Sequence, residues 1–253
     1  MMRYLHAEWT KLRTLPSTGR LLLALVAVTV AVSVAAATVV SCASAGCGYD
    51  PAKISLFGIQ AGQAVVAVLA VGAISGEFGT GLIRTTLAAM PNRIAVLAVK
   101  AVLLTGLTLA AGGLAVLGSA LAGQRILLGN GFPPARLAFD GPMVRAAVGS
   151  VLYLALVALL SLGIATAVRD SAAAIGVVLG LLYLFPAVIL MIPDPDLATL
   201  LWQISPTTAG LTIQATTQLS GLPLSPWAGL GVLAAWAGAA LVTGGLLLRA
   251  RDA

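Results

Sequence analysis

Charged residues are scarce in this chain of 253 residues. Asp, Glu, Lys and Arg make up 9% of it, 60% is hydrophobic, and the mean hydropathy is +1.05. A soluble domain needs more polar surface than this to cover its core, so the composition predicts lipid as the solvent. Aromatic residues make up only 5%, and the basic residues are dispersed. The net charge of +6 therefore does not predict a nucleic-acid partner, which requires a basic patch.

The residue patterns of common catalytic sites are missing as well. The chain has one histidine, His6, which we expect at the surface, and it lacks the patterns GxxxxGK[ST], HExxH and GxSxG. No Asp or Glu lies in the middle of an apolar run, so a paired-carboxylate site is not expected. We therefore expect no enzyme activity, no metal and no cofactor in this chain. Ion-driven carriers usually place an ionisable residue or a broken helix near the membrane midplane, so this absence also disfavours them.

Long apolar runs are abundant, and charged residues separate them. A transmembrane helix needs about 20 mostly apolar residues. The sequence accordingly predicts an all-α integral membrane protein with an N-terminal segment, 1–20, followed by a six-helix transmembrane domain, 21–253. The six predicted spans are about 21–40, 56–75, 101–121, 146–168, 171–192 and 227–248.

The distribution of Lys and Arg predicts the orientation of these spans. With both termini inside, ten basic residues face the cytoplasm and four face outwards, as the positive-inside rule requires. We expect a multi-pass membrane protein with both termini in the cytoplasm. Lys100, at the start of the third span, is expected to extend towards the inner headgroups.

The first 20 residues predict an amphipathic helix on the inner membrane surface. Leu5, Trp9 and Leu12 recur at helical spacing, while Glu8 and Lys11 fall largely on other faces. A loosely ordered basic tail is the alternative. Pro16 to Gly19 are expected to break this helix before the first span.

Three segments on the expected outer side carry further signals. Cys42 and Cys47 lie in the loop 41–55, where an oxidising exterior permits a disulfide; two idle thiols are the alternative. The loop 123–143, rich in Gly and Pro, is expected to be a connector. The uncharged stretch 197–225 contains two prolines, with a third directly after it, and many Thr and Gln residues, so we expect short helices in the outer leaflet rather than a seventh span.

Glycine is common, with 28 residues, and it produces three GxxxG matches. Chance predicts about that number at this glycine content, so these matches by themselves indicate no helix pairing. They begin at Gly58, Gly72 and Gly176.

The loop between the second and third predicted spans has an unusual pattern for its length. Glu77 and Arg84 are seven residues apart, so a helix would place them on one face. Ile83, Leu87 and Met90 would form an apolar stripe. The pattern favours a short, bent, partly amphipathic helix below the membrane. An ordinary basic inner loop is the alternative.

Four stretches together resemble the membrane subunits of type-2 ABC exporters, most closely the standalone permeases common in high-GC Gram-positive bacteria. The stretches are AEWTKLRTLPSTGRLLLAL (7–25), GEFGTGLIRTTLAAMPNR (76–93), AVLAVKAVLL (95–104) and ISPTTAG (204–210). Each motif is weak alone, and the resemblance depends on finding all of them in register with six spans.

The resemblance implies that the loop after the second span is a coupling helix, which docks on a separate ABC ATP-binding subunit beside the N-terminal helix. It implies that ATP is bound by that partner, and that the chain forms a homodimer or a heterodimer with a second permease. Its substrate is not readable from the sequence. The implied ATPase contacts are polar at Glu77, Arg84 and Arg93, and apolar at Phe78, Leu82 and Leu87.

Two other functional classes stay open at this point. One is an autonomous secondary carrier or channel, which an uncoupler would inhibit without any dependence on ATP. The other is a membrane anchor or assembly partner that transports nothing. A tightly bound P-loop ATPase would distinguish an exporter permease from both.

Overall fold

The computed structural model describes residues 2–14, 16–42, 48–79, 93–133 and 140–250, and their regular structure is entirely helical. Six helices in these ranges are long and apolar enough to cross a membrane, which indicates a multi-pass membrane protein. They are α2 (Pro16–Val39), α4 (Ile59–Gly79), α6 (Arg93–Gly129), α7 (Gly141–Val168), the segment Ser171–Ile189, and α12 (Pro226–Ala250).

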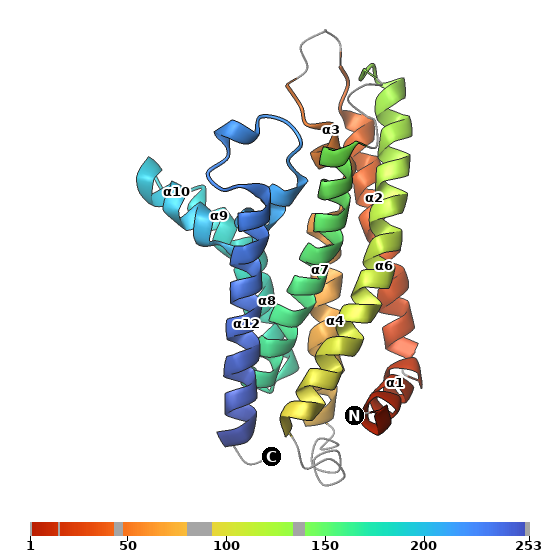
Figure 1. Cartoon of the computed structure of the whole chain (residues 1–253), viewed down its shortest axis with the longest axis vertical. Coiled ribbons are helices and arrows are strands. Elements are labelled where there is room, and N and C mark those ends of the chain that lie inside the picture. The colour runs from red at the N-terminus through yellow and green to blue at the C-terminus, as the bar shows by residue number, and fades with distance from the viewer. Residues whose placement is uncertain (1, 15, 43–47, 80–92, 134–139, 251–253) are drawn as a thin grey trace.

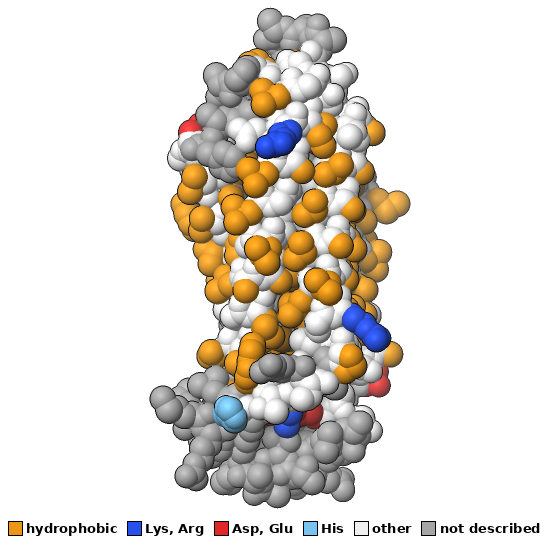
Figure 2. All heavy atoms as spheres, turned by 90° about the vertical axis from the view of Figure 1, so that its right-hand side faces the viewer, with side chains coloured by type: hydrophobic (Ala, Val, Ile, Leu, Met, Phe, Trp, Pro, Cys, Tyr) orange, Lys and Arg blue, Asp and Glu red, His pale blue; other side chains and the backbone are white. Residues whose placement is uncertain are grey.

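The long helices run side by side along the long axis of the molecule (Figure 1). The short helix α1 (Met2–Thr14) and the last turn of α12 lie at one end, which we call the α1 end. The five-residue helix α3 (Pro51–Ser55) lies at the opposite end, the α3 end. Figure 2 shows one face of the bundle, with hydrophobic side chains over its middle and charged side chains towards its two ends.

Helix α7 is the centre of the packing and lies against α4, α6 and α12. Its first turn is capped by the Asp140 side chain, which accepts a hydrogen bond from the Met143 N–H at 3.1 Å. Tyr153, Leu154 and Leu160 are among its fully buried side chains. A helix that is apolar on every side belongs at the centre of a bundle.

Helix α6 is longer than the predicted third span. Its 37 residues extend about 55 Å at 1.5 Å per residue, against about 30 Å for a bilayer core. The predicted loop 123–143 was therefore wrong over its first residues, because Arg125 ends the apolar run but does not end the helix. The helix stops at Gly129, and Gly131 follows at φ +86°, a left-handed conformation that suits glycine.

The fifth span is not one continuous α-helix. It consists of α8 (Ser171–Leu179), a π-helical turn η2 (Gly180–Leu184) and α9 (Phe185–Ile189), three residues shorter than predicted. Pro186 has no N–H to donate to the carbonyl of Leu182, and the Thr207 hydroxyl donates to that carbonyl instead, at 2.9 Å. Side-chain compensation of this kind lets a helix bend at a proline.

The segment between the fifth and sixth spans folds as short helices at the α3 end: α10 (Pro195–Ile204), α11 (Pro206–Gly210), and the 3₁₀ turns η3 (Leu211–Gln214) and η4 (Leu219–Gly221). Asp50 fastens this segment to α3, because its carboxylate caps α3 and also accepts hydrogen bonds from the N–H groups of Thr216 and Thr217.

Glycines at the start of α4 allow close packing against α2. A Cβ added at Gly58 would lie 1.9 Å from the Thr29 carbonyl oxygen, and one at Gly62 would lie 2.4 Å from the Thr29 hydroxyl. The GxxxG match at these two residues therefore lies in a close contact with α2. The number of glycines in the sequence did not predict this contact. In the matches that begin at Gly72 and Gly176, an added Cβ would meet no atom of the described structure within 4 Å.

Candidate functional site: an ion cluster at the α1 end

Helix α1 presents a charged face to the bundle. Glu8 and Leu12, one turn apart, are both buried, while Trp9 is 43% exposed. At Glu8 the charged face of α1 is therefore a packing face rather than a surface one. Amphipathic spacing identifies a helix with two unlike faces, but it cannot show that partners for the charges exist on another helix.

Four side chains from three helices form what we call the ion cluster: Glu8 and Lys11 on α1, Glu77 on α4 and Lys100 on α6. The Lys100 ammonium lies 2.6 Å from Glu8 Oε2 and 2.8 Å from Glu77 Oε1. Lys11 Nζ lies 2.8 Å from Glu8 Oε1 and 3.0 Å from Glu77 Oε1. Each lysine thus bridges both carboxylates, and the four formal charges sum to zero.

The cluster is largely closed to solvent. Glu8, Glu77 and Lys100 are 1%, 8% and 3% exposed. Lys100 also donates to the Ala73 carbonyl at 3.2 Å, so its three N–H groups all have acceptors. Its ammonium therefore points into the bundle, whereas we expected it to extend towards the headgroups.

The two ionisable groups on α1 have shifted pKa values. Burial of the Glu8 carboxylate by itself would raise its pKa, but the charges and hydrogen bonds of Lys100 and Lys11 outweigh burial, so the pKa is lowered. Burial of Lys11 would lower its pKa, but hydrogen bonds and charges from Glu8 and Glu77 outweigh it, so the pKa is raised. Both shifts favour the charged forms and therefore the docked position of α1.

Two arginines connect the remaining helices at the same end. Arg93, the first residue of α6, donates to the Leu248 carbonyl in the last turn of α12 at 2.8 Å. Arg169, between α7 and α8, lies with Cζ 5.4 Å from the ring centre of Phe78 and donates to the Leu247 carbonyl. A cation near the last carbonyls of a helix interacts favourably with its dipole. Together with the ion cluster, these contacts connect α1, α4, α6, α12 and the junction between α7 and α8.

Three of the six residues predicted to contact the ATPase contact other residues of this chain instead. Glu77 pairs within the ion cluster, the Phe78 ring lies near the Arg169 guanidinium, and Arg93 donates to α12. Leu82, Arg84 and Leu87 lie outside the described residues. Cys42 is disulfide-bonded. Cys47 also lies outside the described residues, so the bridge between these two cysteines stays a prediction.

A second polar group lies between the helices and was missed in the sequence. The Tyr153 hydroxyl donates to the side-chain oxygen of Gln63, and the Tyr183 hydroxyl donates to the carbonyl of Gln60. Gln63 is 1% exposed, and its amide nitrogen has no partner in the described part of the chain. Two glutamines at i and i+3 in an apolar span were the available signal.

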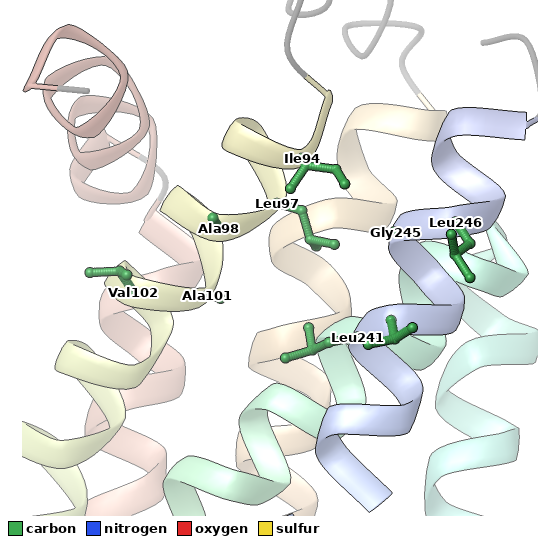
Figure 3. A pocket seen from close by; sticks show the side chains of 9 residues that line it. Ile94, Leu97, Ala98, Ala101, Val102, Leu241, Gly245 and Leu246 are labelled. Atoms are coloured by element: carbon green, nitrogen blue, oxygen red, sulfur yellow. The ribbon is translucent and has the colours of Figure 1, made fainter.

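A groove of about 510 Å³ lies between α6 and α12 near the α1 end (Figure 3). Only apolar side chains and Gly245 line it, among them Ile94, Leu97 and Leu241. It offers no polar group to orient a ligand, so the chemistry at this end comes from the ion cluster. Within the described residues, no three His, Cys, Asp or Glu side chains are placed to hold a metal ion.

The docking of α1 should depend on pH with limits at both ends. Glu8 has a lowered pKa, so its contribution is present above its ordinary value of 4.5 and lost as pH falls through the lowered pKa. Lys11 has a raised pKa, so its contribution is present below 10.5 and lost as pH rises through the raised pKa. Spin labels at Thr10 and Leu246 should give one constant distance between about pH 4.5 and 10.5, and a longer, broader distribution outside it.

The matched control for this titration is Glu8→Gln, which keeps the size of the side chain. It should weaken the docking of α1 at neutral pH, and the distance between the labels should then change less as the pH falls below 4.5. If the distance in Glu8→Gln changes with acid pH as it does in the unmodified chain, another group controls docking.

No protein-family model matches the chain, and no curated protein matches its sequence.

Proposed function

We propose that the chain is the membrane-spanning permease subunit of an ATP-driven ABC exporter, which forms the translocation path and couples to a separate ATPase subunit. The carrying observation is the ion cluster, because it fastens α1 to the two helices that border the loop 80–92. Helix α4 ends at Gly79 on one side of this loop, and α6 begins at Arg93 on the other. The four motifs that resemble type-2 exporters include all three of these elements.

The ion cluster would let the helices that it joins transmit force from the ATPase to the bundle. A pull on the loop 80–92 acts on α4 and α6 together, because Lys100 and Glu77 join them at 2.8 Å. The contacts of Arg93 and Arg169 extend this connection to α12 and to the junction between α7 and α8. Closure of two ATPase subunits would then tilt a rigid group of helices rather than bend one loop.

This geometry gives Glu77 a positioning role in the proposed coupling. Its carboxylate holds α1 and α6 beside the loop, and in the proposal Arg84, Leu82 and Leu87 provide the contacts to the ATPase. The chain provides no nucleotide site in this scheme, and ATP is bound by the partner. A pair of such permeases, identical or related, completes the transporter.

Purification in a mild detergent tests the proposal directly. The tagged chain should bring down a P-loop ATPase, and both Glu77→Lys and Arg84→Glu should reduce its recovery or uncouple ATP hydrolysis from export. Arg125→Glu, a charge reversal of the same size at the α3 end, is the control and should have no effect. If both loop variants leave association, ATPase rate and export unchanged, the proposed coupling is wrong.

One observation favours the second candidate, an autonomous secondary carrier or channel. The fifth span is interrupted by a π-helical turn, and the buried Gln63 and Tyr153 lie beside it in the bundle. Carriers often build substrate sites at such breaks. Transport by the purified chain alone in vesicles, abolished by an uncoupler and independent of ATP, would support this candidate over the exporter.

A further inference from the structure

A cavity of about 340 Å³ opens at the α3 end, between the start of α4 and the short helices that follow the fifth span. Lys53 and Phe57 border it on the α3–α4 side, and Trp202, Thr208 and Gln214 border it on the other. Unlike the apolar groove of Figure 3, this cavity combines polar groups with aromatic rings. Cavities that bind small molecules typically have this character.

Three hydrogen-bond donors around the cavity have no partner in the described structure. They are the Lys53 ammonium, the side-chain amide of Gln60 and the indole N–H of Trp202. The hydroxyls of Thr208 and Thr212, by contrast, already donate to backbone carbonyls, at 2.6 Å each. The free groups are therefore donors, one of them cationic, and donors of this kind bind an anion.

One acidic residue, Asp50, lies close to Lys53 and could neutralise its charge. Asp50 and Lys53 both line an adjoining cavity, but no ion pair joins them within the described residues. The Asp50 carboxylate accepts hydrogen bonds from the N–H groups of Ala52, Thr216 and Thr217 and from the Thr216 hydroxyl. These donors offset the charge of Asp50, and the Lys53 ammonium stays available.

The position of the cavity indicates what kind of anion it receives. It lies where the apolar run of α4 begins, and Phe57 is 46% exposed beside it. Aromatic rings and lysines gather at the depth of the lipid headgroups. We propose that this cavity is a binding site for the headgroup of an anionic phospholipid, with the phosphate at Lys53 and Gln60 and the acyl chains beside Phe57. The proposal concerns this chain alone and does not depend on an ATPase.

Native mass spectrometry of the purified full chain tests this site. Phosphatidylglycerol and phosphatidylcholine are added separately in detergent, and the bound fraction is measured at increasing lipid concentration. Phosphatidylglycerol should bind more tightly. Lys53→Glu should weaken its binding about tenfold or more, because a hydrogen bond to a charged group is lost and a repulsion replaces it. Lys53→Arg should retain binding, and Gln60→Leu should weaken it by a smaller factor.

Arg125→Glu is the matched control, since Arg125 is an exposed cation at the same end but does not line the cavity. It should bind phosphatidylglycerol like the unmodified chain. Equal loss in Arg125→Glu and Lys53→Glu would show a general charge effect and overturn the site. Equal affinity for the two lipids, or unchanged binding in Lys53→Glu, would also overturn it. Because no ATPase is present, these outcomes are separate from those that test the exporter proposal.

Discussion

Lys100→Met should lower the stability of the protein by about 3–5 kcal/mol, the usual cost of removing one partner of a buried ion pair. The Glu8 and Glu77 carboxylates would then face each other with only Lys11, whose side chain is 39% exposed, to balance them. For a chain of this size the expected fall in the thermal midpoint is on the order of 10 °C. Thermal unfolding in detergent, followed by size-exclusion chromatography, measures it.

Lys53→Met is the control that separates the loss of an ion pair from the loss of a lysine side chain. Lys53→Met removes an exposed lysine that has no ion pair among the described residues, and it should change stability by less than about 0.5 kcal/mol. The triple variant Glu8→Gln, Glu77→Gln and Lys100→Met removes the buried charges together and should recover most of the loss. If Lys100→Met and Lys53→Met are equally stable, the cluster does not hold the helices as described.

Gly163→Val should separate α7 from α12, with a loss of about 3 kcal/mol or more. A Cβ at Gly163 would lie 2.4 Å from the carbonyl carbon of Ala240 and 2.6 Å from the backbone nitrogen of Leu241. These are backbone atoms, so the whole of α12 would have to shift. Small residues at helix contacts in membranes serve this close approach. The thermal midpoint and the susceptibility of α12 to limited proteolysis measure the effect.

Gly238→Val is the matched control, because a Cβ at Gly238, on the partner helix α12, meets nothing within 4 Å in the described structure. It should leave both measurements nearly unchanged. Similar destabilisation by the two substitutions would mean that valine in α12 or α7 harms the helices themselves, and that the close contact is not the cause.

The spanning helices were predictable because each apolar run is long and most of the runs are bounded by charge. The first, fourth and sixth predicted spans lie within α2, α7 and α12 except for one residue at the end of the first. Helix ends were less predictable: α6 continues beyond Arg125, because charge ends an apolar run whereas a turn ends a helix. The break in the fifth span had a signal in Pro186, which stands inside an apolar run and cannot donate a backbone hydrogen bond.

The candidate site was only partly predictable. Glu77 was identified as a significant residue in its loop, but its partners are 66 residues before it and 23 after it, in Lys11 and Lys100. The GxxxG matches show the same limit. Gly58 packs against α2, whereas a Cβ added at Gly72 would meet no atom of the described structure within 4 Å. Local spacing fixes which residues share a helix face, and it carries no information about which helix that face meets.

The amino-acid sequence by itself determined that this protein is helical and that six of its segments are long and apolar enough to cross a membrane. These properties follow from backbone hydrogen bonding and apolar transfer, which act over about 20 consecutive residues. Only the tertiary structure decided that Glu8, Lys11, Glu77 and Lys100 meet and that Lys100 points inwards. An ion pair between distant segments depends on packing across the whole bundle, because a charge is stable inside it only where the fold supplies its partners.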